Sequence, residues 1–86
     1  MVKKMNNAQI VIEAIIAALQ DGGYDPFDQL CGFLKTGDET FITRRNGARN
    51  KVKSVNKMDL ASYISENAPG NRHRQLGKDW LINHTD

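Results

Sequence analysis

A cluster of basic side chains is the feature of this 86-residue sequence that most directly suggests chemistry. Six of its twelve Lys and Arg residues fall between positions 44 and 57, although the net charge of the chain is only +2. Positive charge gathered in one segment favours contact with an anionic partner. The alternative is a basic face that serves only solubility, and the charge run alone does not decide between the two. The six residues are Arg44, Arg45, Arg49, Lys51, Lys53 and Lys57.

Residues that could carry catalysis or bind a metal are sparse. His73 and His84 have no Cys or carboxylate at metal-ligand spacing, and Cys31 has no partner in a recognisable nucleophile pattern. Among the carboxylates that could form a catalytic pair, Asp25 and Asp38 are better explained as helix caps. We therefore expect no enzymatic activity, no metal and no cofactor.

The segment that carries the basic cluster has two possible structures. A hairpin turning on Asn46 and Gly47 would set Arg44 directly opposite Arg49, and like charges in that position destabilise a strand pair. A helix capped by Asn46 instead places its apolar residues on one side at helical spacing. We therefore predict a basic helix between residues 44 and 57, whose apolar side comprises Ala48, Val52 and Val55.

The first expected helix, capped by Asn6 or Asn7 and ending at about Gln20, is apolar on most of its circumference. Its main apolar stripe leaves Ile12 and Ile16 outside. A helix of this kind needs two partners, and in so short a chain one of them can be a second copy of the molecule. We predict a homodimer with Ile12 and Ile16 at its interface. The alternative is a central helix inside a monomeric bundle.

Cap and stop residues indicate further short helices. Asp25 stands at an N-cap position before Pro26, and Gly37 supplies a left-handed stop. Asn56 begins another helix, and Cys31 lies at the spacing of a core residue. Because 86 residues suffice for one small core, we predict an all-α fold, a compact small bundle of about four to five short helices.

The end of the chain and the cellular location are less constrained by the sequence. Residues 68–86 are mostly polar, and this C-terminal tail either packs back through Trp80 or is disordered. The most apolar run is ten residues long and contains Glu13, which is too short for a membrane span. A lone cysteine without a recognisable signal peptide suggests a cytoplasmic location.

Residues 18–55 contain several distinctive pieces in a particular order: Gly23-Tyr24-Asp25-Pro26, Gln29, Gly32, Gly37-Asp38, Ile42-Thr43 and Ala48-Arg49-Asn50. In these pieces and their order the segment resembles the small IreB-type regulatory phosphoproteins of Gram-positive bacteria. The resemblance covers roughly Ile10 to Asn67, so we take residues 1–67 as an IreB-like helical domain.

The resemblance implies an all-helical homodimer without enzymatic activity. It also implies a role downstream of a membrane Ser/Thr kinase and its phosphatase, restraining cell-wall precursor synthesis and cephalosporin resistance. In relatives the basic residues of the "ARN" helix matter for regulation, a role that carries onto Arg49 and Lys53. The family's phosphorylated threonine lies in an N-terminal segment, but this chain has no Ser or Thr before Thr36, so its phosphorylation site is unknown.

Two functions follow as competing hypotheses. In the first, a regulatory dimer docks an acidic surface of a protein partner through Arg44, Arg45, Arg49 and Lys53. In the second, the basic helix 44–57 lies along the phosphates of a nucleic acid. The sequence shows no recognisable helix-turn-helix and no side-chain set placed to read bases, which favours the protein partner.

Overall fold

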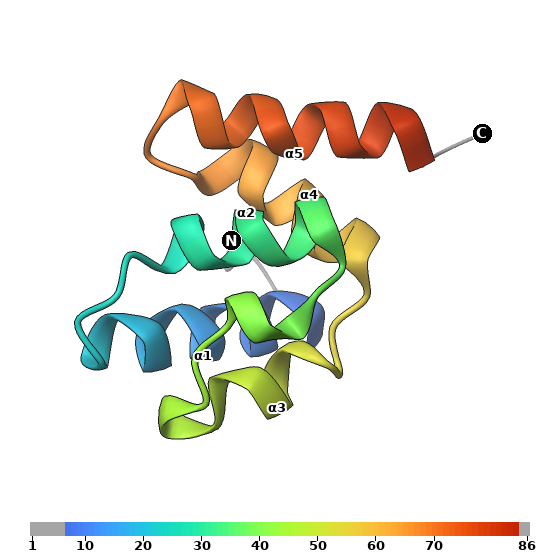
Figure 1. Ribbon diagram of the computed structural model, residues 1–86. Helices are drawn as coiled ribbons and strands as arrows, with labels where there is room; N and C mark the ends of the chain where they lie inside the picture. The colour runs from blue at the N-terminus through green and yellow to red at the C-terminus, as the bar shows by residue number, and fades with distance from the viewer. Residues whose placement is uncertain (1–6, 85–86) are drawn as a thin grey trace, which may run out of the picture.

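The computed structural model describes residues 7–84, which form five α-helices and two short 3-10 helices (Figure 1). Within this range there is no strand, and the predicted all-α bundle is confirmed. Asn6, one of the two expected caps of the first helix, lies outside the described residues. The elements in chain order are α1 (Asn7–Asp21), α2 (Pro26–Thr36), η1 (Glu39–Phe41), η2 (Arg45–Gly47), α3 (Ala48–Val52), α4 (Lys57–Asn67) and α5 (Asn71–His84).

Local cap chemistry fixes several of these boundaries as the sequence predicts. The Asp25 side chain accepts hydrogen bonds from the backbone N–H groups of Phe27 and Asp28 at 3.1 and 3.3 Å, and Pro26 opens α2. Gly37 ends this helix with φ 74°, a left-handed conformation that costs glycine little. Asn56 caps α4 by accepting a 2.7 Å hydrogen bond from Met58 N–H.

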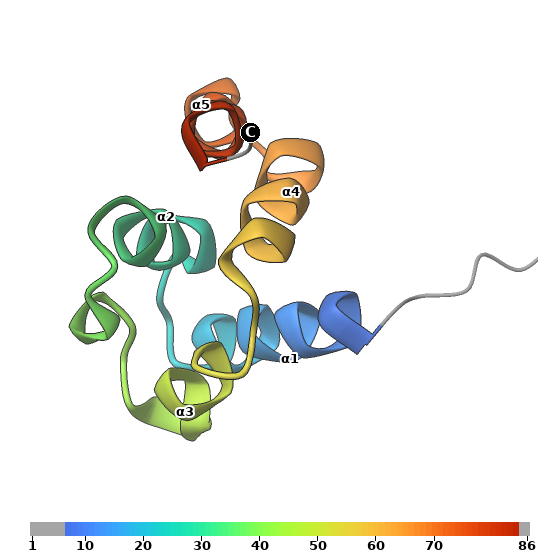
Figure 2. The same cartoon turned by 90° about the vertical axis from the view of Figure 1, so that its right-hand side faces the viewer.

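The helices are arranged in tiers around one core (Figures 1 and 2). Helix α1 packs against α2, α3 and α4, while α5 packs against α2 and α4 on the opposite side of that pair. Every α-helix except α5 contributes a large buried apolar side chain to the core, as does the connection between α2 and α3 through Ile42. The largest fully buried side chains are Ile12, Ile15, Leu19, Leu30, Ile42, Val52, Leu60 and Ile64.

The buried face of α1 differs from the predicted one. Ile12 is 1% exposed inside the chain's own core, whereas Ile10 is 52% exposed. A second copy could therefore reach Ile12 only by opening the core, which corrects its assignment to a dimer interface. Ile16 is partly buried at the edge of the core. The outward face of α1 instead carries Ile10, Ala14 and Ala17.

Helix α5 includes most of the residues of the polar tail. It crosses α4 closely at the buried Gly77, where an added Cβ would lie 2.7 Å from the Ala61 carbonyl oxygen and 2.9 Å from the Ser65 nitrogen. Trp80 is partly buried against the core. The close approach of the two helices therefore requires glycine, which has no side chain, at position 77.

We expect Gly77→Ala to lower the free energy of unfolding by about 1–3 kcal/mol, because the new methyl group would push apart two helix backbones. Urea unfolding followed by circular dichroism would measure this change. The matched control is Gly70→Ala, since an added Cβ there meets nothing within 4 Å. Equal unfolding midpoints for the two variants would contradict the packing described for Gly77.

Candidate functional site

The connection between α2 and α3 is held by local hydrogen bonds and one buried side chain. Asp38 caps η1, accepting hydrogen bonds from the N–H and hydroxyl of Thr40 at 2.9 and 2.7 Å. These bonds are the main cause of a lowered pKa of the Asp38 carboxyl, with a smaller contribution from the charge of Arg49. Ile42 is fully buried, and the next N–H, that of Thr43, donates to the Gln29 side chain at 3.0 Å. The backbone leading into the basic segment is therefore well anchored.

The cap predicted for the basic helix, Asn46, is wrong. Asn46 adopts φ 56°, and its side-chain amide donates to the Ala18 carbonyl oxygen at 3.0 Å and to an Asp21 carboxylate oxygen at 3.2 Å. It therefore ties the loop to the end of α1, and Gly47, with φ 72°, stands at the cap position of α3. Residues 41–55 form no hairpin, as predicted.

The basic helix is also shorter than predicted. Helix α3 spans only Ala48–Val52, so Arg44 and Arg45 precede it and Lys53 follows it. Ala48 and Val52 are fully buried, as their helical spacing predicts, and Val55 is partly buried in the connection to α4. Fixing these apolar residues in the core determines which basic side chains face outward.

Arg49 has a structural contact as well as a charge. Its Nε–H donates a 2.9 Å hydrogen bond to the carbonyl oxygen of Ile42, and its side chain is partly buried. This contact joins α3 to the end of η1. Because only Nε takes part, the remaining N–H groups of the guanidinium stay available for an acceptor outside the chain.

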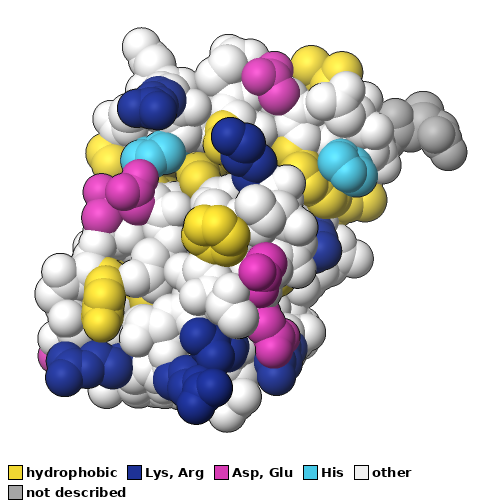
Figure 3. Space-filling view, in the orientation of Figure 1, with side chains coloured by type: hydrophobic (Ala, Val, Ile, Leu, Met, Phe, Trp, Pro, Cys, Tyr) yellow, Lys and Arg dark blue, Asp and Glu magenta, His cyan; other side chains and the backbone are white. Residues whose placement is uncertain are grey.

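A cleft of about 320 Å³ opens beside this contact. Figure 3 shows Lys and Arg side chains gathered over the part of the surface near α3, with acidic side chains next to them. One of the acids lines the cleft, where Glu39 forms an ion pair with Lys53 at 3.4 Å. Both side chains of that pair are about half exposed, Lys53 at 50% and Glu39 at 44%. The residues lining the cleft are Glu39, Arg44, Arg49, Asn50 and Lys53.

The structure thus brings together three of the four predicted partner-binding residues. Arg44, Arg49 and Lys53 line one cleft, whereas Arg45 is exposed on η2 and does not line it. Sequence reasoning missed Glu39 and Asn50 as members of this site. Asn50 directly follows Arg49, so an exposed polar residue beside the predicted helix was its only signal. The position of Glu39 depends on how the chain folds back after α2.

The described residues show neither a reactive thiol nor a cluster of metal ligands. Cys31 is 5% exposed, as its core spacing predicts, and burial, with the nearby carboxylates of Asp28 and Asp25, raises the pKa of its thiol to about 11. The thiol is therefore protonated and unreactive at neutral pH. Residues 7–84 contain no group of three or more His, Cys, Asp or Glu residues that could hold a metal ion. No described helix is long and apolar enough to cross a membrane.

Comparison with known proteins gives one family. The model of a family described as IreB regulatory phosphoprotein matches residues 1–67. A relative from Acetivibrio thermocellus named UPF0297 protein is 32% identical over 62 residues, which is 72% of this chain and 69% of the relative. No solved structure matches the chain. The matched residues include the whole basic cleft and exclude α5.

We expect Arg49→Ala to lower the free energy of unfolding by about 1–2 kcal/mol, because it removes a charge-assisted hydrogen bond to the Ile42 carbonyl group. Arg44→Ala is the matched control. Its side chain makes no hydrogen bond or ion pair within residues 7–84, so its effect should stay within about 0.5 kcal/mol. Urea titration of both variants tests the difference, and an Arg49→Ala protein as stable as the control would contradict a structural role for this arginine.

Proposed function

The chain belongs to the IreB regulatory phosphoprotein family, and from this membership we propose a non-enzymatic regulator that captures an acidic surface of a protein partner. The observation that carries the proposal is the cleft beside α3. It gathers three cations, Arg44, Arg49 and Lys53, against a single carboxylate, that of Glu39. A partner carboxylate would restore the charge balance that the chain itself leaves incomplete.

Each cation is suited to a different part of this contact. The Arg44 side chain makes no hydrogen bond or ion pair within the described residues, so its whole guanidinium is available to a carboxylate. Arg49 is held in place by its bond to Ile42 and is therefore oriented before a partner arrives. Lys53 pairs with Glu39 across a half-exposed contact. Exposed pairs contribute only about 0–1 kcal/mol, so a partner could displace it at low cost.

The same cleft supports a protein partner better than a nucleic acid. Glu39 lines the cleft, and Asp38, the cap of η1, directly precedes it, so a phosphate backbone would meet negative charge there. Helix α3 has only five residues, which offers little length for reading bases in a groove. Binding to mixed DNA or RNA remains the competing outcome of the test below.

Family resemblance refines the proposal. We propose that this protein acts with its partner downstream of a membrane Ser/Thr kinase, and that it restrains cell-wall precursor synthesis and cephalosporin resistance. Residues 1–35 contain no Ser or Thr, so a phosphorylated residue within this sequence would be Thr36 or a later one. Arg45, exposed beside the cleft, would meet the partner at its periphery.

Two substitutions, each of which removes one charge but of opposite sign, test the cleft. Glu39→Gln releases Lys53 from its ion pair and should strengthen partner capture by about two- to fivefold. Arg44→Gln removes a cation and should weaken capture by a similar factor. A photo-crosslinking amino acid at Asn50 would report the captured partner in host cells, and the yield of the crosslinked band would be compared among the variants.

The matched control places the crosslinker at Gln20, an exposed residue on α1 that does not line the cleft. Yields from Asn50 that change in the same direction for both variants would contradict an acidic partner. A salt-dependent mobility shift with mixed DNA or RNA that is lost in Arg44→Gln would support the nucleic-acid function instead.

We also propose that the protein is a homodimer through the outward face of α1. This face presents Ile10, which is 52% exposed, together with exposed Ala14 and Ala17, and small residues allow close helix contact. Ile16 would lie at its border. Light scattering after size-exclusion chromatography should give the mass of two chains for the parent protein and of one chain for Ile10→Glu. A parent protein that is monomeric at micromolar concentration would contradict a dimer through α1.

A further inference from the structure

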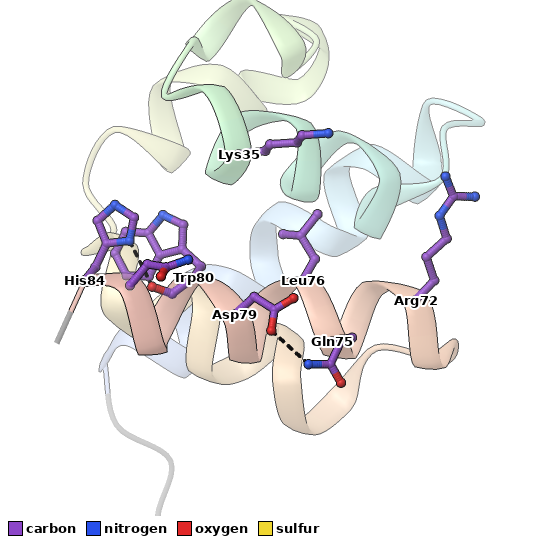
Figure 4. A pocket seen from close by; sticks show the side chains of 8 residues that line it. Lys35, Arg72, Gln75, Leu76, Asp79, Trp80 and His84 are labelled. Atoms are coloured by element: carbon purple, nitrogen blue, oxygen red, sulfur yellow. Dashed lines mark hydrogen bonds between the residues drawn. The ribbon is translucent and has the colours of Figure 1, made fainter.

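A second cleft, of about 510 Å³, lies between α5 and the end of α2 (Figure 4). It is lined along one continuous face of α5, because the α5 residues recur at three- and four-residue intervals. Only Lys35 comes from α2. The α5 residues are Arg72, Gln75, Leu76, Asp79, Trp80, Asn83 and His84.

This face of α5 is distinct from the face that fixes the helix to the bundle. The buried Gly77 packs against the backbone of α4, and His73 lies 3.1 Å from an Asp28 carboxylate oxygen at the start of α2. Neither Gly77 nor His73 lines the cleft. Helix α5 is therefore held in place by its contacts with α4 and α2, while the face that lines the cleft points outward. The cleft consequently exists before any partner binds.

The floor of the cleft is apolar and aromatic. Leu76 and Trp80 are only partly buried, although both contact the core. Figure 4 shows Leu76 directed from α5 towards α2, with Lys35 on the facing helix. Trp80 stacks on His84 with ring centroids 4.0 Å apart and an interplanar angle of 7°. This stacked pair forms a flat aromatic surface of the kind that anchors partner side chains.

The charges around this floor are unbalanced. Lys35 and Arg72 are both exposed, and neither makes a hydrogen bond or ion pair with its side chain among residues 7–84. The one carboxylate lining the cleft, Asp79, accepts a 2.9 Å hydrogen bond from the Gln75 side chain. An occupant that brought a carboxylate next to an apolar group would therefore complement both the floor and the rim.

We propose that this cleft binds an acidic amphipathic segment of a partner protein. An apolar side chain of the segment packs on Leu76 and Trp80, and carboxylates flanking it pair with Lys35 and Arg72. Such docking of an amphipathic segment into an apolar groove is a recurring mode of peptide recognition. Helix α5 lies outside residues 1–67 and only Lys35 lies within them, so most of this site is beyond the family match. The site shares no residue with the basic cleft beside α3.

A displayed library of random peptides, selected on the full chain, tests the proposal because such a selection requires no identified partner. The double variant Lys35→Glu/Arg72→Glu serves as the counter-target, and its circular dichroism and urea midpoint should match the parent because both side chains are exposed. Trp80 is the only tryptophan of the chain, so its fluorescence reports directly on occupancy of the cleft. We expect enriched peptides that place Asp or Glu beside a large apolar residue, shift Trp80 emission, and bind the double variant about tenfold more weakly.

The matched control is Arg44→Glu/Arg45→Glu, which makes the same change of charge away from the α5 cleft and should leave peptide binding and the emission shift intact. Enriched peptides without acidic residues, equal binding to parent and double variant, or an unchanged Trp80 emission would each overturn the proposal. So would a failure to enrich any peptide. Trp80 emission that shifts with protein concentration alone would overturn it too, because a second copy would then fill the cleft. Peptides that bind the basic cleft beside α3 instead would bind more weakly to the Arg44→Glu/Arg45→Glu control and would leave Trp80 emission unchanged, so the two proposals fail separately.

Discussion

Burial of one face of α1 is the constraint on which the rest of the molecule depends. Ile12, Ile15 and Leu19 are almost completely removed from water by three short helices, α2, α3 and α4. None of those helices is long enough to be stable alone, so each exists because its own apolar side joins this core. The connection between α2 and α3 is bound to the same core through Ile42.

This arrangement explains why the basic residues form a cleft rather than a stripe. A long helix over residues 44–57 would have spread the cations along one side. Helix α3 is instead short, and its residues Ala48 and Val52 are buried in the core, while the 3-10 helix η1 lies beside it. Glu39 then faces Lys53, and Arg49 reaches the Ile42 carbonyl group. Arg49 therefore links stability to the charge of the site, and its removal tests both at once.

The two clefts differ in chemistry and in their relation to the family. The cleft beside α3 is charged, lies within the matched residues 1–67, and is lined by polar side chains only. The cleft along α5 has an apolar floor and lies mostly on residues beyond that match. A chain with both could hold two partners, or two parts of one partner, on separate surfaces.

Much of the helix content could be predicted from the sequence because it depends on short-range chemistry. Asp25, Gly37 and Asn56 act within a few residues of their own positions, and the buried spacing of Ala48 and Val52 follows from helical periodicity. The order of the motifs along the sequence was also enough to identify the family.

Tertiary structure alone decided the rest. On a helix as apolar as α1, periodicity cannot distinguish Ile12 from Ile10, and only the positions of its neighbours select the buried face. Likewise, Asn46 bonds to Ala18, Glu39 enters the basic cleft, and Lys35 meets α5 through contacts between segments far apart in the chain, which no local pattern encodes.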